Sequence, residues 1–194
     1  MISKIKGLFD NDLRVWLALA AGIYFIGIVF GLTVHSSWLN NQVQSLVNSA
    51  KQVQGLSSSG IFFFILRNNL TAMIYSFLFG PVLLIFPIFA MFENGAILSL
   101  VGLDVTQNHS ILVFFAGILP HGIIEIPAFI IGAAASMSFS FALIRGIFSA
   151  AHRPDIGPSF SRNLIRLGIA ALVLIPAAFI EAFITPLVIK AAGG

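Results

Sequence analysis

Long apolar stretches make up most of this chain, and short polar segments separate them. Residues 15–34 form a stretch of 20 residues without a charged side chain, long enough for a helix to cross the roughly 30 Å hydrocarbon core of a bilayer. Similar stretches follow at 61–79, 82–103 and 167–189, and a longer one runs from 111 to 144. The polar residues 104–110 and the basic residues 145–166, which contain Pro and Gly, predict loops between them. The pattern predicts an all-α integral membrane protein with a bundle of about five transmembrane helices.

The polar segments predict how this bundle begins and how its first helices are connected. Residues 1–14 are basic and mildly amphipathic, which is typical of an interfacial lead-in to a first crossing. In residues 36–60, apolar positions recur at helical spacing while Gln, Asn and Ser fill the other face. That pattern predicts an amphipathic helix on the outer membrane surface. Residues 61–190 would form the rest of a single membrane domain that spans 1–194.

The composition supports the membrane assignment and excludes several kinds of chemistry. Hydrophobic residues make up 58% of the chain and charged residues 9%, whereas a soluble domain carries about 25% charged residues. The chain has no cysteine, which excludes a disulfide, a thiolate metal site and a thiol nucleophile. A net charge of +3 is better explained by membrane orientation than by nucleic-acid binding.

The basic residues predict that orientation. Five crossings place seven of the ten Lys and Arg residues on one side of the membrane, and such residues gather in cytoplasmic segments. We therefore expect a cytoplasmic N-terminus, a C-terminus outside, and a net single crossing by residues 111–144. The seven are Lys4, Lys6, Arg14, Arg145, Arg153, Arg162 and Arg166.

The sequence "LPHGIIEIPAF" (119–129) places a helix breaker and ionisable groups inside the longest apolar stretch. Pro120 lacks a backbone N–H and clashes with the preceding helical turn, and Gly122 adds flexibility. A backbone break at membrane depth has to be buried in protein or line a wet cavity. We therefore expect residues 111–119 to form a re-entrant or half-helix segment, with His121 beginning the fourth full crossing.

Polar residues in the other apolar stretches indicate a common polar centre. His121 and Glu125 are four residues apart and so share one helix face, and Pro176 with Glu181 repeats the pairing of a helix break with a carboxylate. Ionisable residues inside a membrane are expensive and mark functional sites. The expected centre contains His121, Glu125, Glu181, Asn69, Asn94 and Asn68, with Glu93 nearby and helix breaks at Pro120, Gly122 and Pro176.

This centre has three interpretations. Its side chains could hydrogen-bond helices together and satisfy the carbonyls that the prolines leave exposed, or they could hold an ion or proton. A metal site is the third, with His121 and Glu125 as weak candidates, because zinc sites use three or four ligands. No serine lies in a nucleophile motif and no glycine-rich loop fits a phosphate, so we expect a protein that is not an enzyme and uses no cofactor.

Four segments resemble the stage II sporulation protein M family in the same order: "RNNLTA" (67–72), "FENGAIL" (92–98), "LPHGIIEIPAFIIGAAA" (119–135) and "FIEAFITP" (179–186). The resemblance implies a multi-pass membrane protein. In spore-forming bacteria a member of the family works with cell-wall hydrolases during engulfment. The family pattern marks Asn69, Asn94, Gly95, Pro120, His121, Gly122, Glu125 and Glu181 here.

Three functions are compatible with these features. The favoured one is a non-enzymatic protein that scaffolds or regulates membrane or cell-envelope partners, because residues 36–60 offer a docking surface. The second is a small ion- or proton-coupled transporter or channel with Glu125 and Glu181 at an intramembrane site, and the third is an intramembrane metalloenzyme. The expected partners are the lipid bilayer, a membrane or envelope protein and a second copy of the chain. Gly27 and Gly31 form G-x-x-x-G, which favours close helix packing within the monomer over dimerisation.

Overall fold

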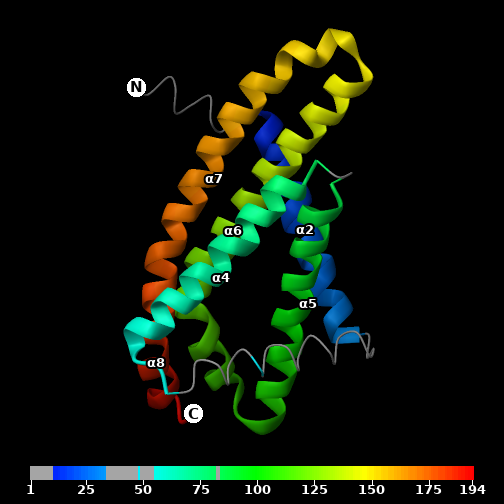
Figure 1. Ribbon diagram of the computed structural model, residues 1–194. Coiled ribbons are helices and arrows are strands. Elements are labelled where there is room, and N and C mark those ends of the chain that lie inside the picture. The colour runs from blue at the N-terminus through cyan, green and yellow to red at the C-terminus, as the bar shows by residue number, and fades with distance from the viewer. Residues whose placement is uncertain (1–10, 34–47, 49–54, 82–83) are drawn as a thin grey trace.

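The regular structure in the described residues (11–33, 48, 55–81 and 84–194) of this computed structural model is helical (Figure 1). Most of the predicted amphipathic segment at 36–60 lies outside the described residues, as do residues 1–10. The helices are α2 (Asn11–Thr33), α4 (Ser58–Phe79), α5 (Ile85–Asn108), α6 (Ile111–Phe148), the 3₁₀ helix η2 (Ala150–Asp155), α7 (Ile156–Phe179), the π turn η3 (Ile180–Ile184) and α8 (Thr185–Ala191).

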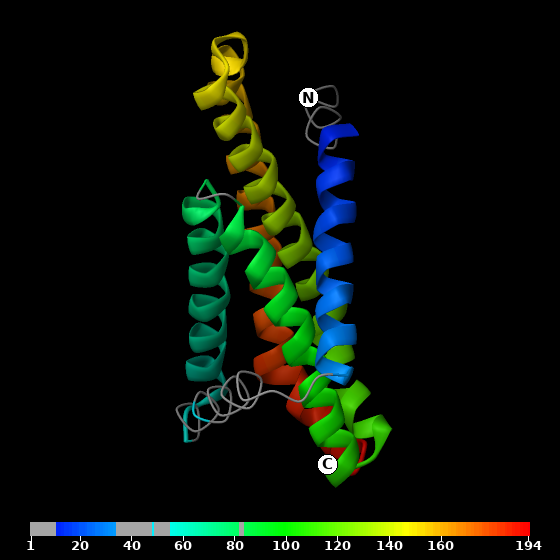
Figure 2. The ribbon, with the colours of Figure 1, turned by 90° about the vertical axis from the view of Figure 1, so that its right-hand side faces the viewer.

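Five helical segments in the described part of the chain are long and apolar enough to cross a membrane, which confirms the predicted all-α membrane bundle. They are α2, α4, α5, α6 and the continuous run from η2 through α8. Successive segments run in alternating directions (Figures 1 and 2). The start of α2 and the hairpin between α6 and α7 therefore lie at one end of the bundle, and the end of α8 lies at the other.

The predicted re-entrant segment at 111–119 is wrong, because α6 runs without interruption from Ile111 to Phe148. Pro120 and Pro127 both lie inside the helix. A proline removes a single backbone donor, which bends a helix and ends it only when packing does not hold it together. The helix breaks expected at Pro120 and Gly122 are therefore absent from α6.

The surplus length of the 111–144 stretch has a different explanation. With 38 residues, α6 is about 57 Å long at 1.5 Å per residue, far more than the hydrocarbon core needs. Figure 2 shows that the α6–α7 hairpin extends past the turn between α4 and α5. The extra turns of α6 and α7 form a protruding helical hairpin.

Two segments that the sequence predicted as loops are largely helical. In residues 104–110, α5 continues to Asn108, and Ser110 then caps α6 by accepting a hydrogen bond from the Val113 amide at 3.4 Å. In residues 145–166, α7 begins at Ile156. Polar residues marked these segments as loops, but helices that leave the bilayer can carry polar side chains without ending.

Glycines bring α2 and α5 into backbone contact within the monomer. A Cβ atom on Gly27 would lie 2.1 Å from the carbonyl oxygen of Phe92, and one on Gly95 would lie 2.1 Å from that of Tyr24. A Cβ on Gly31 would lie 2.5 Å from the carbonyl oxygen of Ala96. The Gly27–Gly31 motif thus packs against α5 in the way that small residues permit in membranes.

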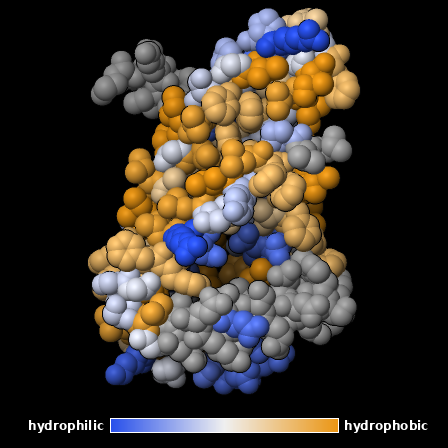
Figure 3. Space-filling model, viewed as in Figure 1, coloured by the Kyte–Doolittle hydropathy of each residue, from blue (hydrophilic) through white to orange (hydrophobic). Residues whose placement is uncertain are grey.

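Small residues also fill the centre of the bundle, while large apolar residues cover its sides. Residues 132–138 of α6 are all buried, and they are Gly, Ala, Ser or Met. Phe25, Phe63 and Leu172 are each more than 60% exposed. Figure 3 shows hydrophobic residues over most of one face, with hydrophilic residues at its two ends and in a patch in its lower half. This distribution suits a bundle whose sides contact lipid.

Candidate intramembrane cation site

A polar cluster lies halfway along the membrane helices. Asn69 occupies the middle of α4, and its amide Nδ2 donates to Oε1 of Glu125 on α6 at 3.0 Å. Asn69 is buried, with 8% of its surface exposed. Since α4 is about as long as a bilayer core is thick, this contact lies near the middle of the membrane.

Three side chains in the cluster converge on one point. One ligand atom each from His121, Glu125 and Glu181 lies within 4.8 Å of the other two. His121 and Glu125 lie one helical turn apart on α6, and Glu181 lies on η3. The cluster therefore joins two segments that are separated by more than 50 residues in the chain.

A π turn positions Glu181. The backbone N–H of Thr185 donates to the carbonyl of Ile180, five residues earlier, in place of the usual four. Pro186 follows and has no N–H to offer Ala182, which helps the helix to widen here. Pro176 lies inside α7 and does not end it, so the irregularity falls at Ile180–Ile184 and not at the predicted break.

His121 and Glu125 on α6 each contact a polar neighbour through one side-chain atom. This contact leaves a second side-chain atom of each residue available as a metal ligand. Glu125 Oε1 accepts from Asn69, and Asn69 Oδ1 accepts from the Asn68 amide at 3.4 Å. His121 Nδ1 lies 3.3 Å from the hydroxyl of Thr185, which is 5% exposed. Nε2 of His121 and Oε2 of Glu125 remain as ligand atoms. Metal-binding histidines and carboxylates are commonly oriented in this way by polar partners.

Glu125 Oε2 is the least satisfied atom of the cluster. It is buried and has no hydrogen-bond partner among the described residues. A buried polar atom without a partner is destabilising by about 1–3 kcal/mol, and more when it is charged. A proton or a bound cation would remove this penalty.

A cavity of about 300 Å³ adjoins the cluster. Its volume would hold several water molecules, each of which takes up about 30 Å³ in the liquid. Asn94 lies on its wall, with its amide donating to the carbonyl of Ala90 at 2.7 Å. Pro120 and Pro176 do not line it. The lining residues are Tyr24, Asn94, Ile97, Leu98, Val101, Ile118, His121, Gly122, Glu125, Ile126, Phe129 and Glu181.

The donor set suits a divalent metal ion. Imidazole nitrogen and carboxylate oxygen are both ligand types that zinc accepts, and water completes the tetrahedron in zinc sites with three protein ligands. Ligand atoms about 2.1 Å from zinc stand about 3.4 Å apart, so the side chains would close by up to about 1.4 Å from their present spread of up to 4.8 Å. Rotation about the side-chain torsions of Glu125 and Glu181 can supply that movement.

Sequence reasoning did not select two residues that the structure places here. Thr185 contacts His121, and Tyr24 of α2 lines the cavity. Thr185 carried a usable signal, because it lies four residues after Glu181 and therefore near the same helix face. Tyr24 carried none, since a single tyrosine in an apolar helix has many possible surroundings.

Comparisons with known proteins agree on one family. The family model described as stage II sporulation protein M matches residues 19–186. The chain is 27% identical over 179 residues to the uncharacterized protein MJ0793 of Methanocaldococcus jannaschii, covering 90% of this chain and 96% of that protein. It is 30% identical over 121 residues to the uncharacterized protein MJ0706 of the same organism, covering 61% of this chain and 53% of that protein. No solved structure gives a significant match. The extent of the family match, from α2 into α8, shows that the chain belongs to the stage II sporulation protein M family.

Proposed function

We propose that this membrane protein binds a divalent cation at His121, Glu125 and Glu181 and carries it, or a proton exchanged for it, through the bundle. The observation that carries the proposal concerns Glu125: its buried Oε2 lacks a hydrogen-bond partner among the described residues, and a carboxylate oxygen of the same residue lies within 4.8 Å of ligand atoms on His121 and Glu181. Transporters place ion sites near the bilayer midplane, beside irregular helix segments. The π turn that carries Glu181 is such a segment.

A purely structural role explains the cluster less well. Polar residues that hold helices together pair their donors and acceptors, as Asn69 and Glu125 do. Glu181 adds a second carboxylate beside Glu125 and no donor that could satisfy it. Two carboxylates at this distance need a shared proton or a cation. The additional acidic group therefore favours a site that binds a positive charge.

Metal-dependent hydrolysis is the second candidate, because three ligands beside a cavity resemble a catalytic zinc centre. Such enzymes also use a carboxylate or histidine as general base. Among the described residues that line this cavity, His121, Glu125 and Glu181 are the only ones with these groups, and all three would be ligands. We therefore propose a non-enzymatic protein. Scaffolding of membrane partners remains a proposal supported by the family resemblance.

Reconstitution into liposomes tests the proposal directly. Wild-type protein in metal-free buffer should bind about one Zn²⁺ or Mn²⁺ per chain in calorimetry. Proteoliposomes should take up that ion faster than protein-free liposomes. Binding without uptake would reject transport and keep the cation site. The absence of both would reject the proposal.

Thr185→Val should weaken metal binding while the bundle stays folded. Valine keeps the shape of threonine but removes the hydroxyl that contacts His121 Nδ1. Loss of such an orienting partner weakens metal sites by roughly 10- to 100-fold. Calorimetric titration with Zn²⁺ would measure the change. Thr71→Val is the matched control, because Thr71 is exposed on α4. Equal affinity in both variants would contradict the assigned role of Thr185.

We propose that the α6–α7 hairpin is cytoplasmic and the end of α8 is outside, since Arg14, Arg145 and Arg162 lie at the hairpin end. Single cysteines can be placed in this cysteine-free chain at Ser161, exposed near the start of α7, and at Gln107, exposed at the end of α5. An impermeant thiol reagent added to intact cells should label Gln107→Cys and spare Ser161→Cys. The reverse pattern would invert the proposed orientation.

A further inference from the structure

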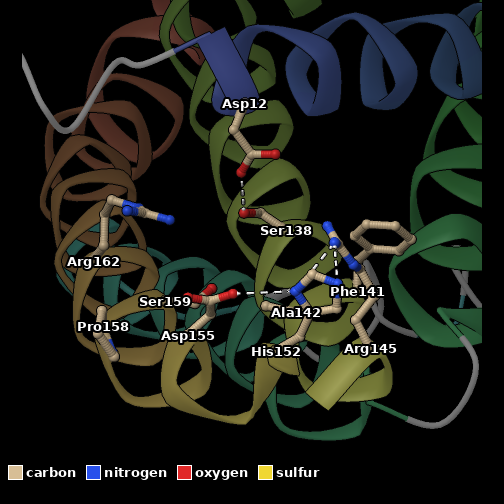
Figure 4. Close-up of a pocket in the computed structure, with 10 residues that line it drawn as sticks. All are labelled: Asp12, Ser138, Phe141, Ala142, Arg145, His152, Asp155, Pro158, Ser159 and Arg162. Atoms are coloured by element: carbon tan, nitrogen blue, oxygen red, sulfur yellow. Dashed lines mark hydrogen bonds and ion pairs between the residues drawn. The ribbon is translucent and has the colours of Figure 1, made fainter. Parts of the chain in front are cut away.

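A second cavity, of about 230 Å³, lies between the start of α2 and the protruding α6–α7 hairpin (Figure 4). It contains no residue of the cation site. Arg145 on α6 and Arg162 on α7 stand on opposite walls of this pocket. Asp12 and Asp155 also line it, so the pocket balances two positive and two negative side chains.

The inner end of the pocket lies at the depth of lipid headgroups. Ser138, at its inner end, is 13 residues beyond Glu125 on α6, or about 20 Å along the helix. Arg145 is 20 residues beyond Glu125, or about 30 Å. With Glu125 near the midplane, the hydrocarbon core ends after about 15 Å and the headgroup layer after about 20–22 Å. The pocket therefore begins in the headgroup layer and reaches its aqueous side.

Arg145 is fixed at the outer rim. Its Nη2 lies 2.7 Å from Nε2 of His152, and its guanidinium carbon lies 5.5 Å from the centre of the Phe141 ring. Arginine only donates, so His152 accepts from Arg145 through a ring nitrogen. Nδ1 of His152 lies 3.3 Å from the same Nη2 and 3.5 Å from Asp155 Oδ2. These contacts use one nitrogen of Arg145 and orient the guanidinium, which has five N–H donors in all.

A buried polar chain sets the inner wall. The Asn163 amide donates to the carbonyl oxygen of Ser159 at 3.0 Å and lies 3.2 Å from the hydroxyl oxygens of Ser138 and Ser159, to which it also donates. Ser138 in turn donates to Asp12 Oδ2 at 2.9 Å, which uses its only proton. Ser159 is 3% exposed and lines the pocket. Because its oxygen already accepts from Asn163, its hydroxyl proton can be donated to a ligand in the pocket.

From this arrangement we infer that the pocket binds the headgroup of a phospholipid that carries an ammonium group, such as phosphatidylethanolamine. The phosphate would lie between Arg145 and Arg162, with the Ser159 hydroxyl as a further donor, since guanidinium groups bind phosphate in a bidentate manner. The ammonium would meet Asp12 or Asp155. Two arginines with two aspartates match a zwitterionic headgroup better than one with only negative charge.

Lipid retention measured by native mass spectrometry tests this inference. Delipidated wild-type protein should bind phosphatidylethanolamine at least tenfold more tightly than phosphatidylglycerol. Arg145→Gln and Ser159→Ala should each weaken that binding by roughly tenfold, which is equivalent to one charge-assisted hydrogen bond. Arg153→Gln is the control, because Arg153 is exposed on η2 and does not line the pocket. It should bind the lipid like the wild type.

Three results would overturn the inference. Equal binding of the two lipids would reject the ammonium subsite, and tighter binding of soluble phosphoethanolamine than of the lipid would identify a soluble ligand instead. Equal lipid binding by Ser159→Ala, Arg153→Gln and the wild type would reject the pocket itself. Ser159→Ala removes a single oxygen and leaves both arginines in place, so it keeps the test valid should Arg145→Gln fail to fold.

Discussion

Glu125→Gln should lower divalent-cation affinity by more than about 100-fold, because losing even a partner behind a ligand weakens metal sites by 10- to 100-fold. Glutamine keeps the length of the side chain and an oxygen that can accept from Asn69 at the position of Oε1. It replaces Oε2, which has no hydrogen-bond partner in the described part of the chain, by an amide nitrogen, which is a donor and does not bind a metal ion. Calorimetry with Zn²⁺ and uptake by proteoliposomes would measure the loss.

The control for this variant is Glu93→Gln. Glu93 is also partly buried in a membrane helix, α5, but it belongs neither to the three-ligand cluster nor to the cavity lining. It should therefore bind and transport like the wild type. If Glu125→Gln binds Zn²⁺ as tightly as Glu93→Gln does, while both elute as folded protein, the cluster is structural and the proposed function is wrong.

Gly95→Ala should destabilise the bundle by about 3 kcal/mol, the upper part of the range for overpacking. The added methyl carbon would lie 2.1 Å from the carbonyl oxygen of Tyr24, which is backbone and cannot rotate away. Helices α2 and α5 would have to separate along their whole contact. The measurement is the fraction of protein that still elutes as a single species from size-exclusion chromatography after heating in detergent.

Gly22→Ala provides the opposite expectation on α2. A Cβ atom on Gly22 meets nothing within 4 Å, and alanine favours a helix over glycine by about 1 kcal/mol. This variant should match or exceed the wild type in heat resistance. If Gly95→Ala resists heat as well as Gly22→Ala does, the close approach of α2 and α5 is not required for folding.

The sequence was sufficient for the number of membrane helices and insufficient for their ends. Uncharged stretches such as 15–34 identify membrane crossings, because a helix needs about 20 apolar residues to cross a bilayer. Residues 104–110 and 145–166 looked like loops because they are polar, yet polar helices are stable outside the bilayer. Pro120 predicted a helix break because proline removes a backbone hydrogen bond and clashes with the preceding turn. However, α6 continues past it.

The membership of the candidate site followed from the sequence in part, while its geometry did not. Glu125 and Glu181 are predictable site residues because the transfer of a carboxylate into a membrane is unfavourable and is retained mainly where it serves a function. The distance between Glu125 and Glu181 depends on the packing of α6 against the last membrane segment. The spacing of these residues along the sequence does not predict that packing. The contact of Asn69 with Glu125, and not with a solvent-facing group, depends on how α4 is rotated about its axis.

The π turn at Ile180–Ile184 also changes the direction in which side chains point along the last membrane segment. An α-helix rotates by about 100° per residue, and a π turn takes up roughly one extra residue. Residues before and after this turn therefore do not fit a single helical wheel. Helix α7 directs Asn163 and Leu174 into the bundle, whereas η3 and the start of α8 bring Glu181 and Thr185 close to His121. The additional residue lets one continuous segment present two differently oriented faces, one for packing and one for the cation site.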